Sequence, residues 1–335
     1  RIQGVNFIVN NSAALSNRRM FFIFAALMCV YLLVIFREAV SQRLEWGFLI
    51  IAATFGLAFA ICIPASTGMV YDDQIHWERS DKLSLGNDYS GYSDGEYNLG
   101  LLKHVYSDHL GTDFYKSYNT TEDQARYHEL LATEGGAAFD SPADSHVDAI
   151  SDTGYLTQAL GISAARLVGL PLHWQFVAGR LGNYLLFVAI AFLAIREAKR
   201  YKAVFTVVLL SPMALLMAGS YSYDPTVIAF CLLGSSIFLS EMMTPDALIK
   251  PWRACMMLLA WTFGCLPKAV YCRPLFLPLL CPAGKSASSQ YIIFFKLFAA
   301  IVGCVLMSSF VIPALVGTED LSDPTRAGIT KLDIS

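Results

Sequence analysis

The sequence WGFLIIAATFGLAFAICIP, residues 46–64, is followed a few residues later by YDDQIHWER, residues 71–79. The first stretch is apolar over the roughly 17 to 25 residues that a helix needs to cross a bilayer core of about 30 Å. The second brings two adjacent carboxylates, a histidine and an arginine to the end of that helix. This order predicts a membrane protein with chemically active side chains at the membrane surface.

The composition also indicates an integral membrane protein. The 335 residues are 55% hydrophobic and 15% charged, against roughly 45–50% and 25% in an average soluble domain. Residues 65–160 hold 17 Asp and Glu but only 5 Lys and Arg, although the whole chain has 27 acidic and 24 basic residues. We therefore expect the acidic and basic residues on opposite sides of the membrane. All eight cysteines lie in or beside apolar stretches, which indicates packing residues rather than disulfides or a zinc site.

Short basic linkers orient the expected helices, because such linkers stay in the cytoplasm. Residues 37–43 and 196–202 are two such linkers. The chain is thus expected to be an all-α polytopic bundle with about eight transmembrane helices. The expected spans are residues 20–36, 46–64, 176–195, 203–219, 225–240, 254–265, 275–280 and 291–312. The sixth and seventh are short for a crossing.

A long exoplasmic first loop, residues 65–172, is expected between the second and third spans. Within it, residues 154–170 predict an amphipathic helix that lies on the outer membrane surface. The expected parts of the chain are an additional N-terminal helix with its cytoplasmic linker (1–45), the main transmembrane module (46–312) and an exoplasmic tail (313–335). Because the sequence starts at Arg1 and stops in a polar stretch, we expect a truncated chain.

The predicted topology gathers polar side chains at the outer ends of the helices. They are Asp72, Asp73, His76, Arg79, Arg180, Asn183, Ser222, Asp224, Lys268, Tyr271 and Arg273. A carboxylate can deprotonate an acceptor hydroxyl, while lysine and arginine can hold the phosphate of a leaving group. This pairing favours group transfer from a phospholipid-like donor. A cluster of Asp72, Asp73 and His76, with Asp224 as a further possible ligand, could also bind a divalent cation such as Mg²⁺ or Mn²⁺.

Several of these residues have a purely structural alternative that the sequence leaves open. Asp224 precedes Pro225 and could simply be the N-cap of the next helix. Arg180 could extend its side chain to the membrane interface. The charges of residues 72–79 could form a solvated helix end.

The order of the motifs resembles one bacterial family of predicted multi-spanning membrane proteins, a domain-of-unknown-function family related to the GT-C glycosyltransferases. The motifs are DDxxHxxR (72–79), QALGI (158–162), GRLxN (179–183), SxSxD (220–224) and KxxY (268–271). The resemblance covers roughly residues 46–312. It implies a GT-C-like helical module whose first exoplasmic loop carries a catalytic acid. It also adds Gln158 to the candidate polar residues.

The resemblance implies an enzyme that takes a sugar from a polyprenyl-phosphate carrier and transfers it to a glycan or lipid acceptor outside the cytoplasm. Asp72 or Asp73 would be the base, and we choose Arg180 and Lys268 as phosphate contacts. The family's acidic pair is usually Asp-Glu after proline, whereas here the pair Asp72-Asp73 follows Tyr71. Which carboxylate reaches the acceptor therefore stays open. The additional first span and the missing C-terminal helices also differ from GT-C enzymes.

The expected location is the plasma membrane, with the active face exoplasmic. The alternative is a non-catalytic lipid or polysaccharide transporter or assembly subunit, in which intramembrane charges would line a pathway. Few charges lie at mid-membrane depth and no inverted repeat is evident, which disfavours this alternative. No Gly-rich phosphate loop is present, so neither cytosolic nucleotide chemistry nor a nucleic-acid partner is expected.

Overall fold

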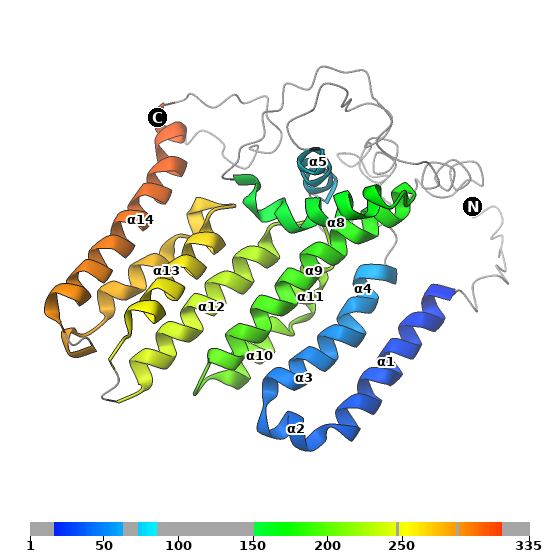
Figure 1. The fold of residues 1–335 in the computed structure, drawn as a ribbon, viewed down its shortest axis with the longest axis horizontal. Coiled ribbons are helices and arrows are strands. Elements are labelled where there is room, and N and C mark those ends of the chain that lie inside the picture. Colours follow the sequence, from blue (N-terminus) through cyan, green and yellow to red (C-terminus); the bar gives the residue numbers. More distant parts are fainter. Residues whose placement is uncertain (1–16, 63–72, 86–150, 246–247, 286–287, 317–335) are drawn as a thin grey trace, which may run out of the picture.

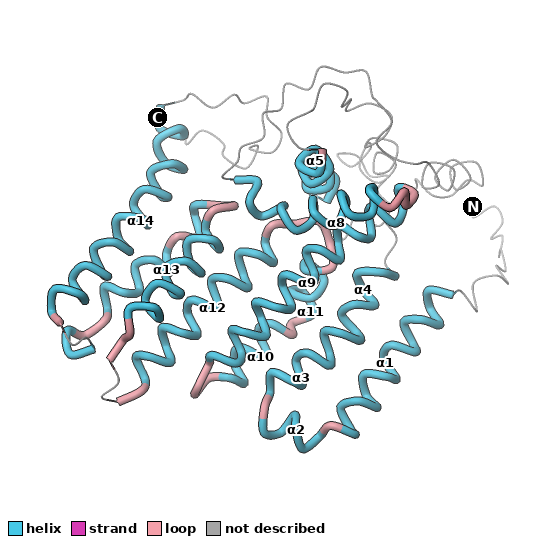
Figure 2. The backbone as a smooth tube through the Cα atoms, in the orientation of Figure 1, coloured by secondary structure: helices cyan, strands magenta, loops and turns pink. Residues whose placement is uncertain are grey.

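The computed structural model describes residues 17–62, 73–85, 151–245, 248–285 and 288–316. Within these ranges every regular element is helical and none is a strand (Figure 2). The elements are α1 (Asn17–Ile35), α2 (Arg37–Gln42), α3 (Leu44–Ile51), η2 (Ala52–Gly56), α4 (Leu57–Cys62), α5 (Asp73–Ser84), η4 (Ser151–Tyr155), α8 (Leu156–Leu167), α9 (Leu172–Glu197), α10 (Lys202–Leu209), α11 (Pro212–Ala218), α12 (Asp224–Met243), α13 (Pro251–Cys265), η5 (Ala269–Tyr271), η6 (Arg273–Leu280), η7 (Ala283–Lys285) and α14 (Ser289–Val316). Most of the predicted exoplasmic loop lies outside the described residues.

The long helices run between two ends of a bundle (Figure 1). One end carries α5, η4 and α8, together with the starts of α9 and α12, and is called the α8 end below. The opposite end carries α2 and the last turns of α9 and α12, and is called the α2 end. Helix α9 packs on α3, α8 and α12, and α12 packs in turn on α13. The sequence-based orientation puts the α2 end in the cytoplasm.

Four helices are long and apolar enough to cross a membrane, which supports the predicted class of integral membrane protein. They are Leu44–Cys62, Leu172–Glu197, Asp224–Met243 and Gln290–Ser309. Large apolar side chains also remain exposed along α1 and α14, as expected for surfaces that face lipid. The other four predicted spans coincide with shorter or interrupted elements, so the count of eight crossings stays a prediction.

The predicted span 203–219 is interrupted in its middle. Helix α10 ends at Leu209, and α11 begins at Pro212. The Ser211 hydroxyl accepts the N–H of Ala214 at 3.3 Å, and Pro212 suits the first helical position because its missing N–H is not needed there. The predicted seventh span is also not an α-helix, because residues 273–280 form the 3₁₀ helix η6 with Pro278 inside it.

A π-helical segment, η2, lies inside the second predicted span. The Ala52 carbonyl accepts the N–H of Leu57 in the wider turn and also the hydroxyl of Tyr184 on α9, the latter at 2.7 Å. Gly56 makes room for this contact, since a Cβ at that position would lie 2.0 Å from the Tyr184 hydroxyl oxygen. The π segment therefore fixes the position of α3 and α4 against α9.

Helix α8 crosses α9 at backbone contact distance. A Cβ added to Gly161 on α8 would lie 2.2 Å from the carbonyl oxygen of Ala178, and one added to Gly182 on α9 would lie 2.0 Å from that of Thr157. Only glycine permits so close an approach of the two helices. The crossing holds α8 on the end of the bundle, where it supports α5 (Figure 1).

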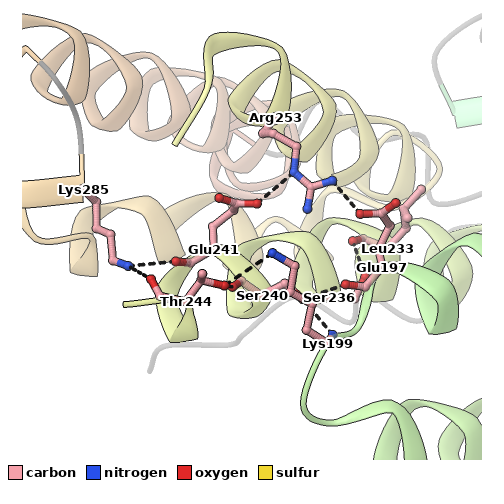
Figure 3. A network of polar contacts seen from close by, with 9 residues as sticks. All are labelled: Glu197, Lys199, Leu233, Ser236, Ser240, Glu241, Thr244, Arg253 and Lys285. Atoms are coloured by element: carbon pink, nitrogen blue, oxygen red, sulfur yellow. Dashed lines mark hydrogen bonds and ion pairs between the residues drawn. The ribbon is translucent and has the colours of Figure 1, made fainter. Parts of the chain in front are cut away.

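An ion-pair network joins the helices at the α2 end (Figure 3). Arg253 on α13 lies between Glu197 on α9 and Glu241 on α12, with Nη1–Oε2 and Nε–Oε1 distances of 2.5 Å and 2.9 Å. The Lys285 ammonium donates to the carbonyls of Glu241 and Thr244 at 3.0 Å and 2.6 Å. These bonds satisfy acceptors at the C-terminus of α12 that lack helical partners.

Candidate functional site

Helix α5 is held on α8 by an ion pair and two hydrogen bonds at one of its ends. The guanidinium of Arg166 lies 2.6 Å from Asp81 Oδ1 and donates to the hydroxyl of Ser84 at 2.9 Å. The Ser163 hydroxyl donates to the Ser84 carbonyl at 3.0 Å. The Asp81 side chain is 2% exposed, so its carboxylate is almost completely shielded from water. These contacts anchor the C-terminal end of α5, which begins at Asp73, on α8.

A series of buried hydrogen bonds through two side-chain amides connects α5 with the loop before α12. The Ser80 hydroxyl donates to Gln158 Oε1 at 2.7 Å, and Gln158 Nε2 donates to the Ser222 carbonyl at 2.7 Å. Asn183 Nδ2 donates to the carbonyls of Ser220 and Ser222 at 3.0 Å and 3.1 Å. Gln158, Asn183 and Ser222 are fully buried. These three predicted residues do come together, and they hold the loop backbone in place.

Two tyrosine side chains contact His76, which lies in the first turns of α5. His76 Nδ1 and the Tyr155 hydroxyl share a hydrogen bond at 2.6 Å. The Tyr223 ring lies edge-on to both, with centroid distances of 5.2 Å to His76 and 5.9 Å to Tyr155. The Lys268 ammonium lies 5.9 Å from the centroid of the Tyr223 ring. Segments that are distant in the sequence therefore meet around Tyr223.

Charged groups complete this arrangement. Arg79 pairs with Asp152 at 3.5 Å, and their side chains are 28% and 7% exposed. Asp224 accepts the Ser222 hydroxyl at 3.2 Å, while its own N–H donates to Ser222 Oγ at 3.1 Å. The seven residues His76, Arg79, Asp152, Tyr155, Tyr223, Asp224 and Lys268 are called the α8-end site below.

A single glycine allows the segments of the α8-end site to meet. A Cβ on Gly154 in η4 would lie 2.5 Å from Tyr223 Cβ and 3.0 Å from Pro267 Cγ. Real Cβ atoms do not approach other atoms so closely, so glycine is required here. Gly154 thus brings η4 against the loop before α12 and against the residue preceding Lys268.

Burial and neighbouring cations set the ionisation of the site. Burial, with the charges of Arg79 and Lys268, lowers the pKa of His76 from 6.5 to about 3. Burial also raises the pKa of the Tyr155 phenol, and of the Tyr223 phenol, where Lys268 opposes the shift. For Lys268, burial favours a lower pKa, but Tyr223, Tyr271 and Asp224 outweigh it and raise the pKa. At neutral pH the site therefore contains a neutral imidazole beside a protonated lysine.

Arg180, predicted as a phosphate contact, is fully buried in α9. Its guanidinium carbon lies 4.5 Å from the centroid of the Phe176 ring, a cation–π distance. The Phe176 ring packs in turn on Trp77 and Tyr221 at centroid distances of 4.8 Å and 4.7 Å. The Arg180 side chain therefore does not extend to the membrane interface, which was the structural alternative for this residue. Its role toward phosphate stays a prediction.

The predicted N-cap role of Asp224 is wrong. Helix α12 begins at Asp224 itself, and Tyr223 is its N-cap. The N–H of Asp224 donates to the Ser222 hydroxyl oxygen, and the Asp224 carboxylate accepts the hydroxyl of the same residue.

Two further predicted site residues, a tyrosine and an arginine, directly precede an apolar groove in the sequence. Tyr271 and Arg273 are exposed at the α8 end of η5 and η6. In a 3₁₀ helix, side chains three residues apart lie above one another, which aligns Arg273 with Phe276. Phe276 lines a groove of about 260 Å³ between η6 and α14. The other lining residues are Cys304, Met307, Ser308, Val311 and Ile312.

The predicted catalytic carboxylates are placed only in part. Asp72 lies outside the described residues, and Asp73 is the first residue of α5, one helical turn before His76. Among the described residues, no group of three or more His, Cys, Asp or Glu side chains could hold a metal ion. His76 and Asp224 are instead hydrogen-bonded within the protein. A divalent cation stays a prediction, since its expected ligands include Asp72.

Sequence reasoning missed Asp152, Tyr155 and Tyr223 as members of the site. Asp152 and Tyr155 directly precede the predicted amphipathic helix, and Tyr223 lies inside the SxSxD motif. The available signal for these site residues was their position, because an acid and aromatic side chains stood at the start of predicted helices. Their partners could not be named, because each contact joins segments far apart in the chain.

The fold and the site together define a polytopic helical membrane protein with a polar site at one end of its bundle. Residues 54–332 match the family model described as "Predicted membrane protein (DUF2142)". The chain belongs to this family of predicted membrane proteins. No curated protein and no solved structure matches the chain.

Proposed function

We propose that this protein is a membrane glycosyltransferase that moves a sugar from a polyprenyl-phosphate donor to a glycan or lipid acceptor of the cell envelope. The observation that carries the proposal is the convergence of Arg79, Asp224 and Lys268 around buried phenols at the α8 end. This end is where α5 begins with Asp73. Cations and carboxylates at one membrane depth are what a lipid-phosphate donor and a hydroxyl acceptor require.

The proposed reaction uses a carboxylate and two cations. Asp72 or Asp73 accepts the proton of the acceptor hydroxyl, whose oxygen forms a bond to the anomeric carbon of the sugar. The bond from that carbon to the phosphate oxygen breaks, and the electron pair leaves with polyprenyl phosphate. Lys268 and Arg273 neutralise the charge that develops on this leaving group. The raised pKa of Lys268 supports this role, since it keeps the ammonium charged.

The apolar groove supports the class of donor. Phosphate held at Arg273 would place the attached isoprenoid chain directly over Phe276 and into the groove between η6 and α14. A groove lined by Met307, Val311 and Ile312 is suited to a hydrocarbon chain rather than to a soluble nucleotide sugar. On this proposal the α8 end faces the exoplasm of the plasma membrane.

The activity can be tested with purified protein in proteoliposomes that contain polyprenyl-phosphate sugars. Mass spectrometry of co-purified lipids identifies the donor first, and transfer from that donor is then measured. We expect Asp72→Asn or Asp73→Asn to lower transfer by about 100- to 10,000-fold, as for loss of a general base. Lys268→Gln should lower it by about 100-fold or more. Glu38→Gln, an exposed acid on α2, is the matched control and should be neutral.

Transfer that is unchanged in both aspartate variants would contradict the proposed base. Absence of any polyprenyl phosphate from an active preparation would contradict the donor. If the protein instead moves a lipid or glycan across the bilayer without a change in its covalent structure, the transporter alternative is correct.

A further inference from the structure

A second cavity lies at the α2 end, away from the α8-end site. Its volume is about 160 Å³, and it lies between the end of α9, the start of α10 and the last turns of α12. Its polar lining consists of Lys199, Arg200, Tyr201, Ser236, Ser240 and Thr244. Among the described lining residues there are two cations and several hydroxyls but no carboxylate. Such a lining is complementary to an anion.

The surrounding network leaves the charge of these two cations uncompensated. Glu197 and Glu241 share Arg253, and Lys285 lies at the same end of α12 (Figure 3). The formal charges of these four residues cancel. Lys202, the next cation along the chain, pairs with Glu45 at 2.8 Å. Within the described residues, Lys199 and Arg200 therefore give the cavity a net positive charge.

Main-chain and side-chain hydrogen bonds hold the cavity wall in position. The Ser240 hydroxyl donates to the Glu197 carbonyl at 2.7 Å and accepts the N–H of Lys199 at 3.1 Å. The Lys199 ammonium lies 3.4 Å from the Thr244 hydroxyl oxygen. An ammonium has three N–H donors, so this single long contact leaves donors available to a ligand.

The cavity lies at the ends of two membrane-length helices, which is the level at which we expect lipid headgroups. It is lined by residues directly after Glu197 and around Met243, where two membrane-length helices end. Phe205 and Leu239 line its apolar side. Beside it, Val204, Val207 and Val208 leave an exposed apolar surface on α10. An anion bound here could therefore carry acyl chains that lie along this surface.

We propose that this cavity binds the phosphate of an anionic membrane phospholipid, with Lys199 and Arg200 as the charged contacts. The hydroxyls of Ser236, Ser240 and Thr244 donate to backbone carbonyls of the cavity wall, so the two cations supply the donors for the phosphate oxygens. Basic pockets between transmembrane helices on the cytoplasmic side are suited to anionic headgroups. The predicted orientation places the α2 end on that side. The inference is independent of the glycosyltransferase proposal.

The test is lipid binding to the purified chain in a neutral detergent, measured by native mass spectrometry. Phosphatidylglycerol and phosphatidylcholine are the probes, and glycerol 3-phosphate tests for a soluble source of phosphate. We expect the protein to bind phosphatidylglycerol in preference to phosphatidylcholine. Lys199→Gln with Arg200→Gln should weaken its binding about twenty-five-fold, since each cation contributes about fivefold at the headgroup level.

The control removes the same charge from the same end of the bundle. Arg196 and Lys250 are exposed and do not line the cavity, so Arg196→Gln with Lys250→Gln should change binding by less than about twofold. Equal losses in the two double variants would show general attraction to a basic surface and overturn the proposal. If the protein binds glycerol 3-phosphate but shows no preference for phosphatidylglycerol over phosphatidylcholine, the ligand is a soluble phosphate and the proposal of a lipid ligand is overturned.

A second variant tests the cavity without removing a cation. Thr244→Glu places a carboxylate beside the Lys199 ammonium and should abolish the preference for phosphatidylglycerol. Thr244→Ser keeps the hydroxyl and should retain it. Thermal unfolding of each variant checks that the fold persists, and retention of the preference by Thr244→Glu would contradict the proposed site.

Discussion

The Nδ1 atom of His76 and the hydroxyl oxygen of Tyr155 lie 2.6 Å apart, although 79 positions separate the two residues. This bond joins the first turns of α5 to the segment that starts α8. The bond is buried, and the Tyr223 ring lies edge-on to both partners. The bond therefore connects the helix that begins with Asp73 to the rest of the α8-end site.

The low pKa of His76 predicts a loss of stability in mild acid. The unfolded chain binds a proton to this histidine below pH 6.5, but the folded protein does so only near pH 3. The unfolded state thus binds more protons between these values, so stability falls as the pH is lowered through this window. The contribution is at most about 1.4 kcal/mol per pH unit.

His76→Asn tests this dependence because asparagine can keep a hydrogen bond to Tyr155 but does not titrate. We expect the variant to be less stable than the parent at pH 7. Between pH 6.5 and about 5, where most carboxylates stay ionised, its melting temperature should fall less steeply. Equal slopes for the two proteins would contradict a buried, neutral His76.

Arg166→Gln should release α5 from α8. The Asp81 carboxylate is nearly fully buried and would lose its charged partner, at a cost of about 1 to 3 kcal/mol after allowance for the partly exposed arginine. Hydrogen exchange of the α5 amides is expected to increase. Adding Asp81→Asn removes the buried charge and should recover part of the loss, whereas additive losses would exclude a direct pair.

The long apolar helices were predictable from sequence, because their length and hydropathy alone define them. The predicted span 176–195 corresponds to Leu172–Glu197, and 225–240 corresponds to Asp224–Met243. The helix break between Leu209 and Pro212 had a sequence signal, because proline interrupts the hydrogen bonding of a continuous helix. The π segment had no such signal, and its contact with the Tyr184 hydroxyl joins residues distant in the sequence.

The sequence predicted which helix ends carry the candidate site, but it did not predict which side chains contact one another there. Topology brought Gln158, Asn183 and Ser222 to one end of the bundle, where the structure places them in one hydrogen-bonded chain. Their burial and scaffold role required knowledge of packing. The pairing of Arg79 with Asp152 likewise depends on how η4 folds over α5, which no local pattern encodes.

Arg253→Gln should destabilise the α2 end strongly. Arg253 is the shared partner of Glu197 and Glu241, so its removal leaves two acids facing each other in a largely buried place. We expect a loss of about 3 kcal/mol or more in the free energy of unfolding. Arg253→Lys should be intermediate, because one ammonium lacks the forked geometry that serves both carboxylates. Denaturant titration in detergent measures both.

Gly154→Ala is the sharpest test of the geometry of the α8-end site. The added methyl group would lie 2.5 Å from Tyr223 Cβ and 3.0 Å from Pro267 Cγ, so η4 must move away from the loop and from Lys268. A displacement of about 1 Å at a catalytic site can cost about 100-fold in rate. Transfer activity should therefore fall by about that factor, while the transmembrane helices remain folded.

Gly284→Ala is the matched control, because nothing lies within 4 Å of a Cβ at that position. Circular dichroism should be unchanged for both variants, and only Gly154→Ala should lose transfer. An inactive Gly154→Ala protein that retains the Lys268-dependent binding of the donor would place the loss in the catalytic step. Full activity in Gly154→Ala would show that the contact between η4 and Tyr223 is not needed, and the α8-end site would then not be the catalytic one.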